Sequence, residues 1–251
     1  MVHKDDTPAW LVERRERVFL VLAGIFICSM TMLNIIGITR FVQLGPMSLA
    51  VGVLPYPITF LCTDLICELY GQRRANFMVT VGLFLNLFIF GVMSLGNVLP
   101  AAESTPPWQA IMLASEVGLP NGSVFKDSAE LFAMLYACTS GAMFASMMAY
   151  IAAQYCDVKL FHFWKRVTKG KYLWVRNNFS TMISQLVDSF TVIAVTFGAA
   201  YFSGDITLQA LFVLLASNYF FKVVCALADT PLFYFFTFKL RDYLQFEHEN
   251  D

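Results

Sequence analysis

The chain has 251 residues, of which 58% are hydrophobic and 14% are charged, and its formal net charge is -1 at pH 7. About a quarter of the residues in a soluble domain are usually charged, so this composition indicates a protein that folds in lipid. Nucleic-acid binding needs a concentrated basic face, which 17 Lys and Arg against 18 Asp and Glu do not indicate, so we expect no DNA or RNA partner.

Six apolar segments are long enough to cross a bilayer, because a helical crossing needs about 20 mostly apolar residues. The expected spans are 18–38, 46–66, 75–98, 129–153, 179–202 and 207–238. The last span is too long for one straight crossing, and Pro231 predicts a kink or break within it. We therefore predict an all-α integral membrane protein with six transmembrane helices in a single domain over residues 1–251.

The first span follows three arginines, Arg14, Arg15 and Arg17. It is longer than the apolar core of a signal peptide and has no Ala-x-Ala exit, so we expect it to remain in the mature protein. Asn34 is a polar residue within this span. It can supply a hydrogen bond to a binding site or pack against another helix.

The second span ends with Asp64 and Glu68, four residues apart and therefore on one helical face. Two like charges at this spacing favour a shifted pKa or a shared cation. Glu68 lies near the membrane interface, where a pair with Arg73 or Arg74 is the alternative. The run Pro55-Tyr56-Pro57 interrupts the span, and such interruptions often expose free backbone groups beside a substrate site in membrane proteins.

The outer loop 99–128 contains four prolines and an apolar stretch at 108–113. This composition suits an external lid and a passive connector equally well.

The fourth span has small residues at four-residue intervals, namely Gly141, Ala145, Ala149 and Ala153. Such a stripe lets another helix approach closely, which favours packing within the monomer, with the contact face of a homodimer as the alternative.

The last two spans each have a polar face at membrane depth. Gln185 and Asp188 are three residues apart on span five, and Asn218, Lys222 and Asp229 follow a single helical face on span six. Lys222 lies near the middle of its span and needs an anion, for which Asp188 is the first candidate and Asp229 the second. Three spans with polar faces are better explained by a shared cavity than by separate ion pairs, although ion pairs that hold helices in register are the alternative for any single residue.

The basic residues are distributed unevenly between the two sides of the membrane. Fourteen of the seventeen Lys and Arg residues lie before span one, after spans two and four, or after span six, and only Arg40 and Lys126 lie in the opposite loops. Positive loops stay cytoplasmic, so we predict that both termini are cytoplasmic. The basic and aromatic segment 155–178 on that side suits the anionic inner leaflet of the bilayer, which is the expected lipid partner.

Motifs of common enzymes are absent from the sequence. It has no His-Glu-x-x-His, no Gly-x-Ser-x-Gly and no Walker loop, and its six cysteines form no CxxC pair or Cys/His cluster. We therefore expect no enzyme, no metal and no cofactor. A membrane enzyme that uses Asp64 and Glu68 as acid and base remains a minor alternative.

Three spaced blocks resemble one known family. The run 57–71 with the following Arg73-Arg74-Ala75 resembles the signature of the queuosine precursor transporters, also called the vitamin uptake transporter family. Gln154, Asp157 and the run 173–181, which includes Arg176, resemble the central block of that family together with Gln185 and Asp188. A third block comprises 219–222 and 230–232.

The resemblance implies bacterial uptake of 7-deazaguanine bases, such as the nitrile and aminomethyl precursors preQ0 and preQ1 or queuine, across the cytoplasmic (inner) membrane, for later insertion into tRNA. Asp188 would accept from the donor edge of the base, and Asp64 or Glu68 would bind a cationic tail or a coupled proton. The substrate-binding residues that we expect are Asn34, Asp64, Glu68, Gln185, Asp188, Asn218 and Lys222. The residues that we expect to support them are Arg74, Gln154, Arg176 and Asp229.

The main alternative is a vitamin-binding subunit of an energy-coupling-factor importer, whose six-helix bundle this family resembles. Such a subunit moves its ligand only with ATPase partners. Its usual Ala-x-x-x-Ala docking stripe is missing from span one, where Ala23 is followed four residues later by Ile27, which favours independent transport. Alternating access around an occluded site also explains a charged cluster better than a channel does. Whether uptake is facilitated or proton-coupled stays open.

Overall fold

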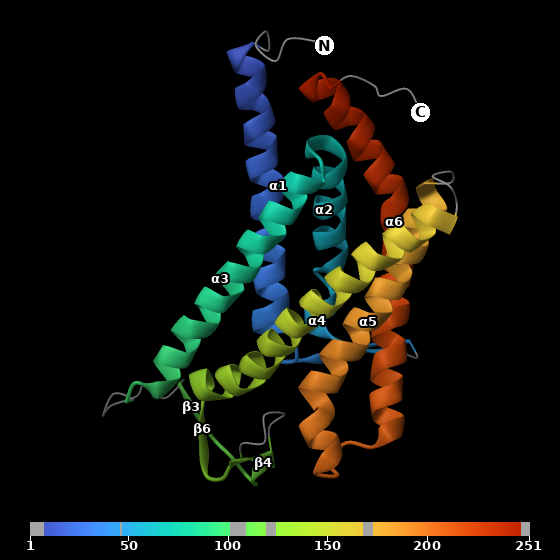
Figure 1. Ribbon diagram of the computed structural model, residues 1–251. Helices are drawn as coiled ribbons and strands as arrows, with labels where there is room; N and C mark the ends of the chain where they lie inside the picture. Colours follow the sequence, from blue (N-terminus) through green and yellow to red (C-terminus); the bar gives the residue numbers. More distant parts are fainter. Residues whose placement is uncertain (1–7, 46, 101–108, 119–123, 168–172, 247–251) are drawn as a thin grey trace.

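A computed structural model describes residues 8–45, 47–100, 109–118, 124–167 and 173–246 of the chain (Figure 1). Six long helices dominate the described part, and six helical regions are long and apolar enough to cross a membrane. This confirms the predicted all-α membrane class. The helices are α1 (Ala9–Ile36), α2 (Tyr56–Tyr70), α3 (Gln72–Val98), α4 (Leu131–Val167), α5 (Leu173–Phe202) and α6 (Leu208–Leu244).

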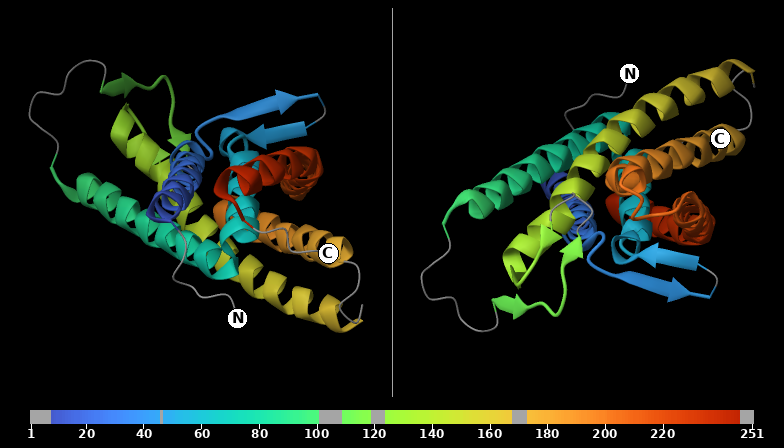
Figure 2. Two further views of the ribbon diagram at one scale, coloured as in Figure 1. Left: turned by 90° about the horizontal axis from the view of Figure 1, so that it is seen from above. Right: turned by 90° about the horizontal axis from the view of Figure 1, so that it is seen from below.

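Helix α2 lies near the middle of the bundle, between α1 and α6, and also contacts α3 (Figure 2). Helices α4 and α5 pack against each other along much of their length, and α5 also packs against α6. The beginning of α1 and the end of α6 lie at the same end of the molecule (Figure 1). We call this end the basic end, because Arg14, Arg15, Arg74 and Arg241 lie there.

Two arginines of α1 hold the last turn of α6 at the basic end. Arg15 donates through Nε to the carbonyl of Leu244 at 3.0 Å and through Nη2 to the carbonyl of Gln245 at 2.8 Å. Arg14 donates to the carbonyl of Tyr243 at 3.1 Å. The last carbonyls of a helix lack partners within the helix and form its negative pole, so both guanidinium groups stabilise this end.

The segment between α1 and α2 is not the straight helix that the predicted span 46–66 implies. Strands β1 (Phe41–Leu44) and β2 (Met47–Ala50) form an antiparallel hairpin, and a short 3-10 turn η1 (Val51–Val53) follows. Helix α2 then begins at Tyr56, directly after Pro55. Proline favours the first turn of a helix, where its missing N–H costs nothing, and it disrupts a helix interior. The two prolines therefore fix where α2 begins.

Two glycines hold this segment against the end of α1. The backbone N–H of Gly52 donates to the carbonyl of Gly37 at 3.0 Å. A Cβ atom at Gly52 would lie 2.6 Å from the Cα atom of Gly37, which is closer than side chains allow. The close approach requires glycine at position 52 and brings the hairpin beside the interior of the bundle.

Helices α4 and α5 extend beyond the predicted spans. Helix α4 continues to Val167 and α5 begins at Leu173, so most of the basic segment 155–178 is helical. Ala145 and Ala149 of the predicted small-residue stripe are completely buried within the monomer. Their burial agrees with close helix packing inside one chain.

The first three helices share a hydrophobic core, and two pairs of short strands form the described part of the outer loop. A hydrophobic core joins α1, α2 and α3 and contains Ala23, Phe26, Cys62, Ile66, Ala75, Met78 and Val79. In the outer loop, β3 (Ala110–Met112) pairs with β6 (Ser128–Glu130), and β4 (Val117–Gly118) pairs with β5 (Val124–Phe125).

Helix α6 continues through Pro231 without a break. The outward faces are apolar, as with Phe84 and Phe88 of α3, which are 66% and 67% exposed. Such surfaces suit lipid rather than water.

Candidate functional site

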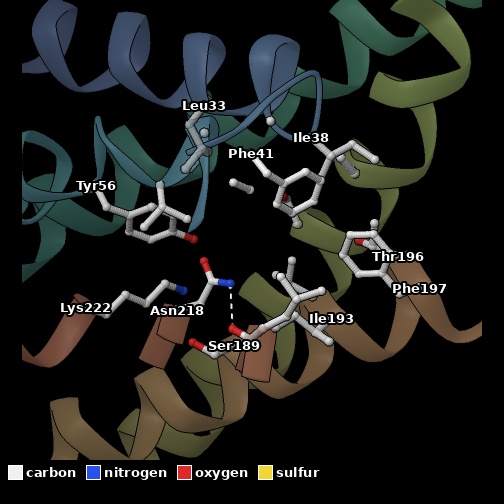
Figure 3. Close-up of a pocket in the computed structure, with 18 residues that line it drawn as sticks. Leu33, Ile38, Phe41, Tyr56, Ser189, Ile193, Thr196, Phe197, Asn218 and Lys222 are labelled. Carbon is white, nitrogen blue, oxygen red and sulfur yellow. Dashed lines mark hydrogen bonds between the residues drawn. The ribbon is translucent and has the colours of Figure 1, made fainter. Parts of the chain in front are cut away.

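A pocket lies between α1, the start of α2, α4, α5, α6 and the β1–η1 segment, and it is partly open to solvent (Figure 3). Apolar side chains form most of its wall, including Leu33, Ile38, Phe41, Ile193 and Phe197. Its polar lining residues are Tyr56, Ser146, Ser189, Thr196, Asn218 and Lys222.

A buried ion pair lies at one end of the pocket. The ammonium of Lys222 on α6 donates to Oδ2 of Asp188 on α5, and the residue Lys222 is only 3% exposed. The hydroxyl of Tyr56 donates to the same carboxylate oxygen at 3.3 Å. A buried charge needs a partner, and Asp188 is confirmed as the partner of Lys222. We call Tyr56, Asp188 and Lys222 the buried cluster.

Three helices bring the buried cluster together. Tyr56 is the first residue of α2, and its ring lies below the ammonium of Lys222, with 4.2 Å between Nζ and the ring centroid. Asp188 lies in the middle of α5, which packs against α6. A cation over an aromatic face is stabilised by the ring quadrupole, so Tyr56 contacts both charges of the pair.

The pocket lies on the side of the ion pair away from the basic end. Helix α5 runs from the basic end outward, and its pocket residues 189–197 all follow Asp188. Helix α6 runs the other way, and its pocket residues Leu214 and Asn218 precede Lys222. The buried cluster therefore lies between the pocket and the basic end.

Several polar atoms of the pocket wall have no partner within the described residues. The hydroxyls of Ser189 and Thr196 are buried and make no hydrogen bond. Asn218 donates through Nδ2 to the carbonyl of Leu214 at 2.8 Å, which leaves its amide oxygen available. A buried polar atom without a partner costs free energy, so these groups are suited to a polar ligand.

Two of the predicted binding residues, Asp64 and Glu68, do not line the pocket. Glu68 pairs with Arg241 at the basic end, whereas Arg74 pairs with Glu16 at 2.7 Å. The suggested pairing of Glu68 with Arg73 or Arg74 is therefore wrong, because α6 ends beside α2 and brings Arg241 closer. Asp64 is exposed and lies two turns beyond Tyr56, about 12 Å further along α2.

Asn34 also lies away from the pocket lining. It is 2% exposed and donates through Nδ2 to Oδ1 of Asn86 at 3.0 Å, which joins α1 to α3. Gln185 and Asp229 each have a buried oxygen without a hydrogen-bond partner in the described chain, and neither lines the pocket. The side chains of Gln154 and Arg176 lie outside the described residues.

The structure also brings in residues that sequence reasoning missed. Tyr56 lies inside the Pro-Tyr-Pro run, which the sequence marked for its prolines rather than for its phenol. Ser189 and Thr196 are seven residues apart, so both lie on one face of α5, and this spacing was an available signal. Phe41 comes from the hairpin, and helical periodicity gave no signal for it.

No group of three or more His, Cys, Asp or Glu side chains in the described residues is close enough to hold a metal ion. The available chemistry of the pocket is therefore that of an ion pair, hydroxyls, an amide and aromatic walls.

The model of the family described as "Putative vitamin uptake transporter" matches residues 50–236, which include the whole buried cluster. The chain belongs to this family. It is a multi-pass bacterial membrane protein, and the predicted family is confirmed. A protein of Bacillus subtilis (strain 168) named "Probable queuosine precursor transporter" is 27% identical over 200 residues, which cover 78% of this chain and 75% of that protein. No solved structure gave a significant match.

Proposed function

We propose that this transporter takes up queuosine precursors, which are 7-deazaguanine bases, across the cytoplasmic membrane. The observation that supports this most strongly is the pocket beside the buried pair of Asp188 and Lys222. Ionisable residues kept inside a membrane bundle commonly mark a substrate path. The printed name of the Bacillus subtilis relative supports the choice of substrate.

The pocket offers complementary groups to a planar base. The ammonium of Lys222 can donate to the ring carbonyl, and the side-chain oxygens of Ser189 and Asn218 can accept from the ring N–H and the amino group. Aromatic and branched apolar side chains on the remaining wall suit the faces of a bicyclic ring. In this proposal Asp188 keeps Lys222 charged and oriented rather than binding the base alone.

The proposed direction of transport rests on the predicted orientation, in which the basic end is cytoplasmic. With the basic end in the cytoplasm, the pocket lies on the outer side of the buried cluster. The Tyr56, Asp188 and Lys222 side chains would then separate the bound base from the cytoplasm until α2, α5 and α6 move apart. This arrangement favours alternating access by a single chain.

Uptake by purified protein in liposomes tests the proposal. We expect saturable uptake of radiolabelled 7-deazaguanine bases and no comparable uptake of adenine or guanine, with the accumulated base chemically unchanged on chromatography. Absence of uptake above that of protein-free liposomes, with the protein correctly folded, would contradict the proposal. Tight binding without uptake, followed by uptake when ATPase partners are added, would instead support the energy-coupling-factor alternative.

A further inference from the structure

We propose that transport moves α4 and α5 together, as one arm, against a frame of α1, α2, α3 and α6 that stays closed at the basic end. The inference rests on the proposed function and adds the moving part of the transporter. It follows from the contacts that hold the helices together, from the position of the pocket between the two parts, and from polar atoms that are buried between them.

The frame is held by the hydrophobic core of α1, α2 and α3 and by contacts at the basic end that join α1 and α2 to α6. Arg15 of α1 donates to carbonyls at the end of α6, and its own carbonyl accepts from the hydroxyl of Tyr70 on α2 at 2.8 Å. The ring of Tyr70 packs edge-on against Phe246, with centroids 5.8 Å apart. Arg241 of α6 pairs with Glu68 of α2. These contacts oppose a separation of α6 from α1 and α2.

Helices α4 and α5 form the arm, because they pack against each other along much of their length. Helix α4 crosses the bundle obliquely, so its beginning contacts α1 and α3 while its last turns lie away from α1 (Figure 1). The hydroxyl of Thr139 donates to the carbonyl of Ile35 at 3.1 Å, and the hydroxyls of Ser94 and Tyr136 are 3.2 Å apart. These contacts hold the first turns of α4 against the frame. They form a pivot far from the basic end, about which the rest of the arm can swing.

The pocket lies in the seam, which is the boundary between the arm and the frame. Ser146 and the pocket residues of α5 line it from the arm, and Leu33 and Lys222 line it from the frame. The contacts of Asp188 with Tyr56 and Lys222 therefore cross the seam. A base that accepts a hydrogen bond from the ammonium of Lys222 would compete with Asp188. Binding would then weaken a contact that holds the arm against the frame.

The seam continues past the buried cluster toward the basic end. Gln185 lies four residues before the pocket residue Ser189 on α5 and shares its helix face. Asp229 lies seven residues after Lys222 on α6 and likewise continues the face that lines the pocket. Gln185 and Asp229 each have a buried oxygen without a hydrogen-bond partner in the described chain. Such atoms cost free energy while they are kept from water, so their hydration favours opening of the seam on this side.

Distances between spin labels test which helices move. Val167 lies at the end of α4 in the arm, Val12 and Phe238 lie on α1 and α6 of the frame, and all three are exposed. Cysteines at these positions are labelled in a background that lacks the six native cysteines and still takes up the base. Pulsed electron–electron double resonance is then recorded in liposomes with and without a 7-deazaguanine base.

We expect the base to shift the distance between labels 167 and 238 by at least about 5 Å, and that between labels 12 and 238 by less than about 2 Å. A change between 12 and 238 as large as that between 167 and 238 would overturn the inference. No change in either pair, in protein that takes up the base, would overturn it as well.

A reversible tether within the frame provides the second test. Glu68→Cys and Arg241→Cys replace the pair that bridges α2 and α6, and a bis-maleimide with a cleavable disulfide linker joins them in the same background. The matched control is the same variant treated with N-ethylmaleimide, which modifies both thiols without joining them. Because the frame stays closed, uptake by the tethered protein should stay within about twofold of this control.

A larger loss of uptake that is reversed by reduction of the linker would show that α6 must separate from α2, and would overturn the inference. If folded wild-type protein takes up none of the 7-deazaguanine bases, the proposed function itself fails.

Discussion

The buried cluster and the ion pairs at the basic end use the same kinds of residue in opposite surroundings. Lys222 and Asp188 have side-chain exposures of 4% and 13%, whereas Arg74 and Glu16 have exposures of 45% and 52%. Water and salt weaken exposed pairs, so these contribute little to stability. A pair inside the bundle has no such screening, and the loss of one partner leaves an uncompensated charge. Burial, rather than the ion pair itself, therefore distinguishes the candidate site from the basic end.

The largest expected effect comes from Asp188→Asn. This change leaves the ammonium of Lys222 buried without a counterion, and breaking such a pair typically costs about 3–5 kcal/mol. We expect uptake in liposomes to fall by at least about 100-fold and the thermal unfolding temperature to decrease. Uptake at the wild-type rate would show that the ion pair has no part in transport.

The double variant Asp188→Asn with Lys222→Met separates stability from binding. It removes both charges, so it should recover most of the thermal stability that the single variant loses, because a neutral replacement of a buried pair is often tolerated. Uptake should stay about as low as in Asp188→Asn, since the ammonium donor is gone. Recovery of uptake together with stability would mean that the pair serves folding alone.

Tyr56→Phe should have an intermediate effect. It removes the hydroxyl that donates to Asp188 but keeps the ring beside Lys222, so the expected cost is about 1–2 kcal/mol. Base affinity, measured by equilibrium titration, should fall by roughly tenfold. A change of less than about twofold would show that the hydrogen bond from Tyr56 to Asp188 does not support base binding.

The smallest effect is expected for Arg74→Gln at the basic end. Its pair with Glu16 is half exposed, and such pairs contribute about 0–1 kcal/mol. Uptake should stay within about twofold of wild type, measured beside Asp188→Asn in the same liposome preparation. A loss as large as that of Asp188→Asn would erase the distinction between the two regions.

The sequence was sufficient to predict the membrane class and the six spanning regions, because length and apolarity decide helical crossing. It was also sufficient for the partner of Lys222, since a cation near the middle of a span needs an anion and Asp188 lies at a similar depth. These predictions follow from the cost of placing polar groups in lipid.

Other features depend on tertiary contacts that a linear pattern does not contain. The close approach of Gly52 to Gly37 holds the segment after the hairpin against the end of α1, and Phe41 of the hairpin lines the pocket. Asp64 was a candidate binding residue in the sequence because it is a carboxylate near the end of a predicted span. Helix α2 places it about two turns beyond Tyr56, so it does not line the pocket. The cytoplasmic position of both termini, the homodimer and the similarity to energy-coupling-factor subunits stay predictions.

Photo-crosslinking tests most directly whether the pocket beside Asp188 and Lys222 binds the base. An azido derivative of 7-deazaguanine would be irradiated with purified protein, and the modified residues would be mapped by mass spectrometry. The account predicts adducts within 189–197 of α5 and 214–222 of α6 that an excess of unlabelled nitrile base prevents. Competed adducts confined to the region of Asp64 and Glu68, with none at the pocket wall, would contradict it.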